Sequence, residues 1–316
     1  MSQDIDAAGA HEVRTFMLNS HWPEFPYPGL RPFSVTNSAD ESLIFYGRNA
    51  HKDDILRRLN IGHTVFVLGP SGCGKSSLIK AGVIPALEAG LLTRAGHRWR
   101  SAEMRPGNRP LAALAKAITS LLPETNEQLV AEVERLLRSE PSGLWLAFDF
   151  VRSSIGIDAE DRCVLLLLDQ LEEVFGRQIV DGKEVDQLMR LITRFFLKPH
   201  PKLFLTLTMR SEFVGDCANF PRLAEVINAS QYLTPVLTPG ELRQAIERPA
   251  TEYGGVVDSD LVQQIIADMG SGTSYESDHL PLMQHALLWL WQRAWRRAGL
   301  ERPPRPDRDP SPQPIR

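Results

Sequence analysis

The pattern G-x-x-x-x-G-K-[ST] is matched in full by one stretch, Gly69-Pro70-Ser71-Gly72-Cys73-Gly74-Lys75-Ser76. Glycines at such positions let backbone N–H groups curl around an anion without Cβ clashes. Lys75 would place a compact positive charge on the β and γ phosphates, and the Ser76 hydroxyl would bind Mg²⁺. The stretch therefore predicts a loop that binds the phosphates of a nucleoside triphosphate, and the residues from Gly69 to Ser77 are its candidate ligands.

The sequence on either side of this phosphate loop supports the same interpretation. Residues 63–68 predict a buried strand before it, and residues 75–89 predict a helix whose N-terminus would point its positive end at the phosphates. The alternative is a glycine-rich turn without a ligand, although a chance match occurs in only roughly 1% of chains of this length. Cys73 fits a small filler residue better than a redox group.

A carboxylate follows a second apolar strand. Residues 163–168 are apolar throughout, as in the central strand of a parallel sheet, and Asp169 comes directly after them. Ligands of open α/β sheets bind at the carboxyl ends of the strands, so Asp169 is a candidate to hold Mg²⁺. Hydrolysis also needs a carboxylate to orient or deprotonate water, for which Glu173 is preferred over Glu172. Alternatively, both glutamates only begin a solvated helix.

An arginine closes the next strong strand. Residues 203–209 predict that strand, and Arg210 follows it. Because neighbouring parallel strands end on the same side of a sheet, Arg210 could reach the γ-phosphate, and its planar fork suits two phosphate oxygens. The alternative is an arginine that pairs with a surface carboxylate.

Strands and helices alternate up to residue 238. Residues 99–104 and 232–237 predict further strands, and helices are expected at 51–60, 111–122, 125–138 and 185–197. This alternation predicts an α/β fold over residues 41–238. It is the three-layer fold of a P-loop nucleoside triphosphatase, in which helices cover both faces of a parallel sheet. Residues 239–299 should form a small all-α lid domain, with helices at 241–247, 261–269 and 282–295.

The two ends of the chain differ from this core. Residues 1–40 form a leader that is rich in proline and turn formers, and its prolines forbid a regular helix. Aromatic residues of the leader, such as Trp22 and Tyr27, should pack on a core. Residues 300–316 combine prolines with alternating charges and should be disordered.

Composition excludes several classes of protein. With 43% hydrophobic and 23% charged residues and a formal net charge of −4, the chain has no overall basic field for nucleic acid or an anionic membrane. The N-terminus lacks the apolar stretch of a secretory signal, and the apolar runs are far shorter than the ~20 residues of a membrane helix. Cys73, Cys163 and Cys217 form no CxxC pair and no disulfide framework, so a reducing cytoplasm fits best.

Several stretches resemble the STAND class of signal-transduction ATPases, relatives of NACHT and NB-ARC proteins, and in particular the first subfamily of the novel STAND group found in bacteria. The similarity covers about residues 26–297. It lies in Tyr27–Phe33, in Phe45-Tyr46-Gly47-Arg48, in the extended phosphate loop Gly69–Leu87, in Arg105-Pro106-Gly107 with Pro110-Leu111, in Asp169–Phe175, and in Leu280-Pro281-Leu282 with His285-Ala286-Leu287.

The resemblance implies an ATP-dependent switch. ADP would hold a closed form, and exchange for ATP, bound with Mg²⁺ and slowly hydrolysed, would open it for self-assembly in bacterial signalling or in defence against phage. Gly47 and Arg48 would border the adenine, and Pro281 would touch the adenine or ribose from the lid. By itself, Pro281 fits a helix-start proline equally well. The choice of ATP over GTP follows from the resemblance alone.

The sequence departs from the family in two places. NB-ARC proteins have Gly before Leu-Pro-Leu, whereas here His279 and Leu280 precede Pro281. Family members continue into a winged helix and a sensor, whereas this chain becomes Pro-rich after about Gly299 and has no obvious N-terminal effector domain. We therefore expect the sensor and effector to be missing or separate, as in a truncated fragment.

Two other functions fit the same motifs. A nucleotide-binding scaffold would bind ATP or ADP but hydrolyse ATP hardly at all, since the closing domain is absent. A DNA-handling ATPase of the loader type shares the Gly-Arg, phosphate-loop and acidic elements but needs a basic face. The basic cluster at residues 293–308 is interleaved with acids and prolines and fits a solvated helix end better, so nucleic acid is not an expected partner.

Overall fold

The computed structural model describes residues 22–35, 38–92, 98–155, 162–176, 181–220, 222–270 and 279–298. The chain forms two compact units. The sheet unit comprises Asp53–Pro70 and Ala86–Thr234, and the lid unit comprises Met1–Lys52, Ser71–Pro85 and Pro235–Arg316. The chain passes from one unit to the other within the phosphate loop. Residues 1–21 of the leader and the tail expected to be disordered, 300–316, lie outside the described residues.

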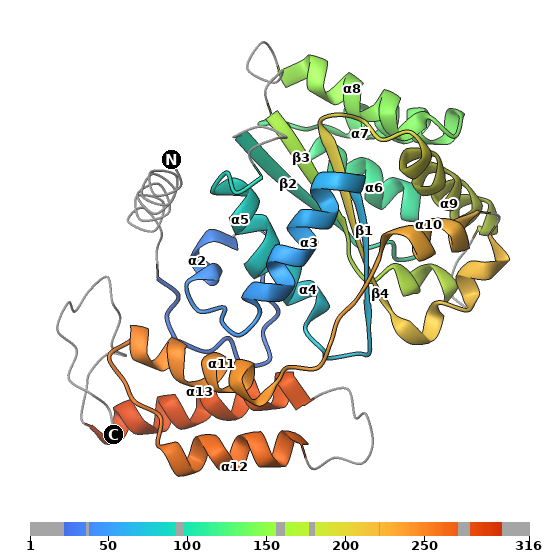
Figure 1. Ribbon diagram of the computed structural model, residues 1–316. Helices are drawn as coiled ribbons and strands as arrows, with labels where there is room; N and C mark the ends of the chain where they lie inside the picture. Colours follow the sequence, from blue (N-terminus) through green and yellow to red (C-terminus); the bar gives the residue numbers. More distant parts are fainter. Residues whose placement is uncertain are drawn as a thin grey trace, which may run out of the picture. The chain divides into compact units, whose positions relative to one another are not determined.

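The sheet unit is built on one five-stranded parallel sheet (Figure 1) with the strand order β2-β3-β4-β1-β5. Its strands are β1 (Thr64–Gly69), β2 (Arg98–Met104), β3 (Arg162–Leu168), β4 (Leu203–Arg210) and β5 (Gln231–Leu233). β1 is buried at every position, and β3 and β4 at all but one, because both faces of the sheet are covered. All the predicted strands are present, although the last one ends at Leu233 rather than near residue 237.

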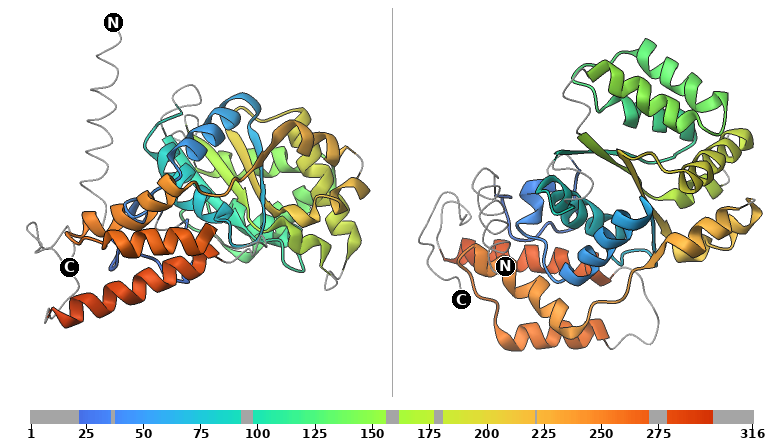
Figure 2. Two further views of the ribbon diagram at one scale, coloured as in Figure 1. Left: turned by 60° about the horizontal axis from the view of Figure 1, so that its bottom comes forward. Right: turned by 45° about the horizontal axis from the view of Figure 1, so that its top comes forward.

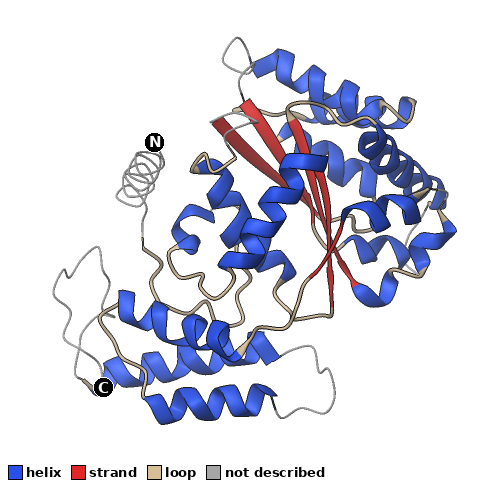
Figure 3. Cartoon of the chain, viewed as in Figure 1, coloured by secondary structure: helices blue, strands red, loops and turns tan. Residues whose placement is uncertain are grey.

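Helices cover both faces of this sheet, as Figures 2 and 3 show. On one face lie α6 (Pro110–Thr119), α7 (Glu127–Ser139), α8 (Gly143–Ile155), α9 (Gly182–Leu197) and α10 (Leu223–Ser230). They share one hydrophobic core with alternate strand residues such as Phe66, Leu166 and Leu205. The other face carries the sheet-unit part of α3 (Asn49–Gly62), with Ile55 and Leu59 buried. The predicted three-layer α/β fold is therefore confirmed.

The lid unit is all-helical in its described part. It contains α2 (Ser38–Ser42), α4 (Lys75–Ser77), η1 (Leu78–Val83), α11 (Pro239–Glu252), α12 (Ser259–Gly270) and α13 (His279–Arg297), while α5 (Ile84–Glu88) lies across the unit boundary. Helix α11 begins with a capping box between Thr238 and Glu241. Burial raises the pKa of Glu241, but hydrogen bonds from Thr238 and the nearby His51 outweigh it and hold that pKa below its ordinary value.

The described part of the leader is packed into the lid core. Tyr27 is 2% exposed, and its hydroxyl donates to the Ile246 carbonyl at 2.5 Å. The Trp22 ring meets the Tyr253 ring edge-on, with 5.6 Å between centroids. Tyr27 also belongs to one hydrophobic cluster with Ile246 and Met283. The expectation that the leader's aromatic residues pack on a core is confirmed, and that core belongs to the lid unit.

The helix after the phosphate loop is less regular than the sequence predicts. Its three segments are α4, the π-helix η1 and α5, rather than one α-helix over 75–89. All six residues of η1 are buried, and a Cβ added at Gly82 would lie 3.2 Å from Phe45 Cε1. The wider π turn thus brings a residue without a side chain against an aromatic ring, and such turns are frequent at functional sites.

Within the described part of the chain, every helix falls short of the length and apolarity needed to cross a bilayer.

The buried Tyr27 hydroxyl gives a stability prediction. Tyr27→Phe should lower the free energy of unfolding by about 1–2 kcal/mol, because it removes a buried hydrogen bond to the Ile246 carbonyl inside the lid core. Urea denaturation followed by circular dichroism measures the change. The control is Tyr46→Phe, which removes an exposed hydroxyl bonded to Glu252 and should cost under about 0.5 kcal/mol. Equal losses in the two variants would contradict the packing described for Tyr27.

Candidate functional site

The phosphate loop begins where β1 ends. Gly69 is the last residue of β1 and lies opposite Arg210 in the register between β1 and β4. Gly72 and Gly74 have φ angles of 66° and 91°, in the left-handed region that favours glycine. The chain therefore turns back sharply on itself between Gly69 and Lys75, as a phosphate-binding loop requires.

The first helical residue after the loop is Lys75. Gly74 is the N-cap of α4, and no side chain caps it, so the first backbone N–H groups of the helix point out of its N-terminus. Lys75 is 8% exposed, and its Nζ lies 3.9 Å from Cys73 Sγ. Ser76 and Ser77 continue α4. Positive charge and N–H donors thus collect at one point, which is the arrangement that binds an anion.

Other predicted nucleotide ligands lie around the loop in the lid unit. The Arg48 guanidinium, 4% exposed, donates to the carbonyls of Cys73 at 2.9 Å and Pro235 at 2.8 Å. Gly47 has a φ of 83°. Pro281 lies in the first turn of α13, and a Cβ added at Gly74 would lie 3.7 Å from Cδ1 of its neighbour Leu280. The start of α13 is therefore close to the phosphate loop.

The carboxylate of Asp169 is held at the carboxyl end of β3 in the sheet unit. Asp169 is 0% exposed, and its Oδ1 accepts a hydrogen bond from the Thr208 hydroxyl at 2.6 Å. Arg105 Nη2 lies 3.5 Å from the other carboxylate oxygen. Gln170 follows with a φ of 60°, rare for a residue other than glycine, and its N–H donates to Thr208 Oγ1 at 2.9 Å. One threonine on the neighbouring strand thus orients both the carboxylate and the turn after it.

The two glutamates of the acidic motif have different partners. Both lie in a short 3₁₀ helix, Leu171–Phe175. Glu172 accepts the Arg210 N–H at 3.3 Å, and the Arg210 guanidinium lies 3.4 Å from it and 3.6 Å from Glu212. Glu173 accepts the N–H of Gly107, in the loop after β2, at 3.0 Å. All these groups lie at the carboxyl edge of the sheet, because the strands are parallel.

The sequence did not single out Thr208, Arg105 or Gly107 as functional residues. Thr208 is a polar residue within an apolar strand, and it lies two positions before Arg210. That combination is the signal that could have identified it. Arg105 and Gly107 belong to a stretch that resembles the family, but their contacts carry no local signal, because only the pairing of β2 with β3 brings the loop after β2 alongside Asp169.

The chemistry of these residues fits Mg²⁺. Asp169 supplies a carboxylate and Ser76 a hydroxyl, and each is a hard oxygen ligand of the kind that Mg²⁺ prefers. Asp169 belongs to the sheet unit and Ser76 to the lid unit.

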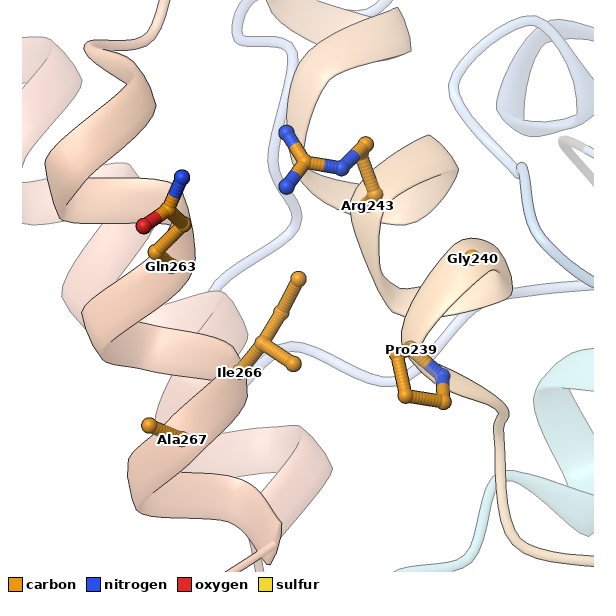
Figure 4. Close-up of a pocket in the computed structure, with 6 residues that line it drawn as sticks. All are labelled: Pro239, Gly240, Arg243, Gln263, Ile266 and Ala267. Carbon is orange, nitrogen blue, oxygen red and sulfur yellow. The ribbon is translucent and has the colours of Figure 1, made fainter.

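A separate pocket of about 300 Å³ lies between α11 and α12 of the lid unit (Figure 4). Ile266 projects from α12 toward Pro239, and Arg243 and Gln263 lie on either side. Arg243 pairs with Glu247 one turn further along α11 at 2.7 Å. The lining contains no residue of the phosphate loop, so this pocket is distinct from the predicted nucleotide ligands.

Comparison with known proteins gives one match to a family. The model of the family described as Novel STAND NTPase 1 matches residues 26–302. The search of curated proteins finds no significant match.

Several solved structures share the fold. The Aeropyrum pernix ORC1 protein in complex with DNA superposes with a TM-score of 0.51 at 18% identity, over 84% of this chain and 65% of that chain. The Aeropyrum pernix ORC2 protein in its ADPNP-ADP complexes gives 0.51 at 15% identity, over 81% and 64%. Cdc6p from Pyrobaculum aerophilum gives 0.50 at 14%, over 81% and 65%. The chain therefore spans just under two thirds of the length of these proteins.

The hydrogen bonds of Thr208 give a prediction for the sheet edge. Thr208→Val should lower the free energy of unfolding by about 2–3 kcal/mol, because it removes the hydroxyl that donates to the buried Asp169 carboxylate and accepts the Gln170 N–H. Thr208→Ser keeps the hydroxyl and should stay within about 1 kcal/mol of the wild type. Chemical denaturation compares the three proteins, and a valine variant as stable as the serine variant would show that this hydroxyl does not hold Asp169.

Proposed function

The chain belongs to the novel STAND NTPase 1 family, and from this premise we propose that it is a switch that binds ATP with Mg²⁺ and hydrolyses it slowly to control self-assembly. One observation carries the proposal. Asp169 is buried and oriented at the carboxyl end of β3, and β1, whose end opens the phosphate loop, lies only one strand beyond, across β4. Strands two places apart are about 10 Å from each other, which suits a triphosphate–metal group at this edge.

Each predicted residue has a role in this proposal. The N–H groups from Gly69 to Ser77 and the Lys75 ammonium bind the phosphates. Ser76 and Asp169 would hold Mg²⁺, which would supply positive charge beside the phosphate oxygens when bound. Gly47, Arg48 and Pro281 border the adenine and ribose.

Glu173 is the better candidate to position the attacking water. The Gly107 N–H fixes the direction of its carboxylate without neutralising the charge. Glu172 instead lies against the Arg210 guanidinium, so its carboxylate already has a charged partner. Arg210 would exchange this partner for the γ-phosphate when ATP is bound, since its side chain is 44% exposed and can move.

The wider biology is proposed from the resemblance. We infer a cytoplasmic protein that acts in bacterial signalling or phage defence, self-associates in its ATP-bound form and works with sensor and effector domains. Because the chain spans under two thirds of the solved structures it resembles, the activity of a whole protein of this kind is part of the proposal.

A nucleotide-binding scaffold without significant hydrolysis is the second candidate. It is favoured by the basic partners of the acidic motif, since Arg105 lies near Asp169 and Arg210 near Glu172. A DNA-handling role has less support. The ORC1 structure contains DNA, but its likeness concerns the fold, and the net charge of −4 gives this chain no general attraction to phosphate backbones.

Lys75→Ala tests nucleotide binding. It should weaken ATP binding at least about a hundredfold, because the compact charge on the β and γ phosphates is lost. Isothermal titration calorimetry with Mg²⁺ and ATP measures the affinity. Lys183→Ala, which removes an exposed charge at the start of α9, is the matched control and should bind like the wild type. Retained affinity in Lys75→Ala would refute the assigned role of the phosphate loop.

Glu173→Gln tests hydrolysis against the scaffold alternative. Turnover of radiolabelled ATP should fall about a hundredfold or more, while ATP affinity is kept, because the amide cannot accept the proton of water. Glu212→Gln, an exposed carboxylate beside Arg210, serves as the control and should change turnover little. If the wild type turns over no faster than Glu173→Gln, the protein is the scaffold.

A further inference from the structure

The buried Arg48 side chain joins two backbone segments that are far apart in the sequence. Its two terminal nitrogens donate to the carbonyl of Cys73, inside the phosphate loop, and to the carbonyl of Pro235, the first lid-unit residue after β5. A guanidinium presents its donors in a rigid planar fork, so both carbonyls are fixed relative to each other. Burial strengthens these bonds, because water does not compete for them.

The residues beside Arg48 contact the first lid helix, α11. A Cβ added at Gly47 would lie only 2.4 Å from the Glu241 carbonyl oxygen, so the backbone of Gly47 rests directly on the first turn of α11. His51 Nε2 lies 3.0 Å from Glu241 Oε1 in the same turn. The Tyr46 hydroxyl donates to Glu252, at the other end of α11, at 3.1 Å.

Phe45 extends the contacts to the helix after the phosphate loop. Its ring lies against Gly82 of η1, and the Phe33 ring of the leader meets it edge-on at 5.7 Å. One short stretch, Phe45–His51, therefore contacts the phosphate loop, the helix that follows it and α11. All of these elements belong to the lid unit.

We propose that Phe45–His51, named here the coupling segment, transmits the state of the phosphate loop to lid helix α11, with Arg48 as the positioning residue. This inference rests on the proposed nucleotide site and describes how that site is regulated. When nucleotide fills the loop, the Cys73 carbonyl is fixed, Arg48 fixes the Pro235 carbonyl in turn, and the start of α11 is held. When the loop is empty, Arg48 still joins the two segments, so both become more mobile together rather than separately.

This role differs from a direct contact between Arg48 and the adenine. A positioning role predicts that Arg48 orders the loop and the start of α11 even without nucleotide. A contact role predicts an effect only when nucleotide is bound. The two roles are therefore separated by measuring the nucleotide-free protein.

The experiment uses the full chain and three variants of the coupling segment. Arg48→Gln removes the charge and one end of the planar fork. Arg48→Lys keeps the charge but cannot reach both carbonyls with fixed geometry. Gly47→Ala keeps Arg48 but displaces the coupling segment from α11. Arg58→Gln is the control for the arginines, because Arg58 also donates to a backbone carbonyl, that of Gln231, but within the sheet unit. Gly90→Ala is the control for glycine, because Gly90 has a φ of 79° and open space around its Cα.

Two measurements decide the proposal. Hydrogen–deuterium exchange of the nucleotide-free proteins should become faster at residues 71–74 and 236–240 together in the three variants and in neither control. Release of a fluorescent ADP analogue, followed by stopped flow, should be about tenfold faster in Arg48→Gln and Gly47→Ala, with Arg48→Lys between these and the wild type.

Unchanged exchange at both segments would overturn the proposal, whatever the release rates. Faster exchange at only one of the two segments would also overturn it, because the segments would not be coupled. If Arg48→Gln does not fold, Arg48→Lys and Gly47→Ala decide. A wild type that binds no nucleotide would refute the proposed function, while exchange of the nucleotide-free proteins would still test the coupling.

Discussion

A carboxylate fully removed from water must be hydrogen-bonded, and the sheet unit is arranged around this requirement at Asp169. The Thr208 hydroxyl on β4 donates a hydrogen bond to the Asp169 carboxylate. Its oxygen also accepts the N–H of Gln170, whose backbone is in the left-handed conformation. This works only if β3 and β4 are neighbours in the observed register. The position of β4 between β3 and β1 also aligns Arg210 with Gly69, where the phosphate loop begins.

Much of this fold could be predicted because its strands are apolar runs and its phosphate loop has a specific pattern. The strands before Gly69 and Asp169 were located to within a residue or two. Helix α8 was missed, because the unbroken apolar run Leu144–Phe148 hides the helical spacing of its buried residues, Leu144, Ala147, Phe148 and Val151. The π turn of η1 was also missed, because no local pattern in Leu78–Val83 distinguishes a π turn from an α-helix, and only the contact of Gly82 with Phe45 marks the position.

The candidate site could be predicted where a single segment carries the signal, and not where several segments meet. Lys75 and Asp169 are each identified by their own neighbours in the sequence. The contacts of Arg105 and Gly107 with the acidic motif depend on the pairing of β2 with β3, which no local pattern encodes. For Arg210 the sequence left two interpretations, and the structure shows the carboxylates of Glu172 and Glu212 beside it.

The burial of Tyr27 in the lid has a practical consequence for choosing fragments of this protein. The α/β domain predicted from the sequence starts at residue 41, so a shortened version would naturally be cut there. Such a cut would remove the Tyr27 ring, which packs with Ile246 and Met283. It would leave an apolar cavity in the lid exposed to water. Fragments for crystallisation or binding assays should therefore start before Trp22. In a shorter fragment the lid would be destabilised for a reason unrelated to nucleotide.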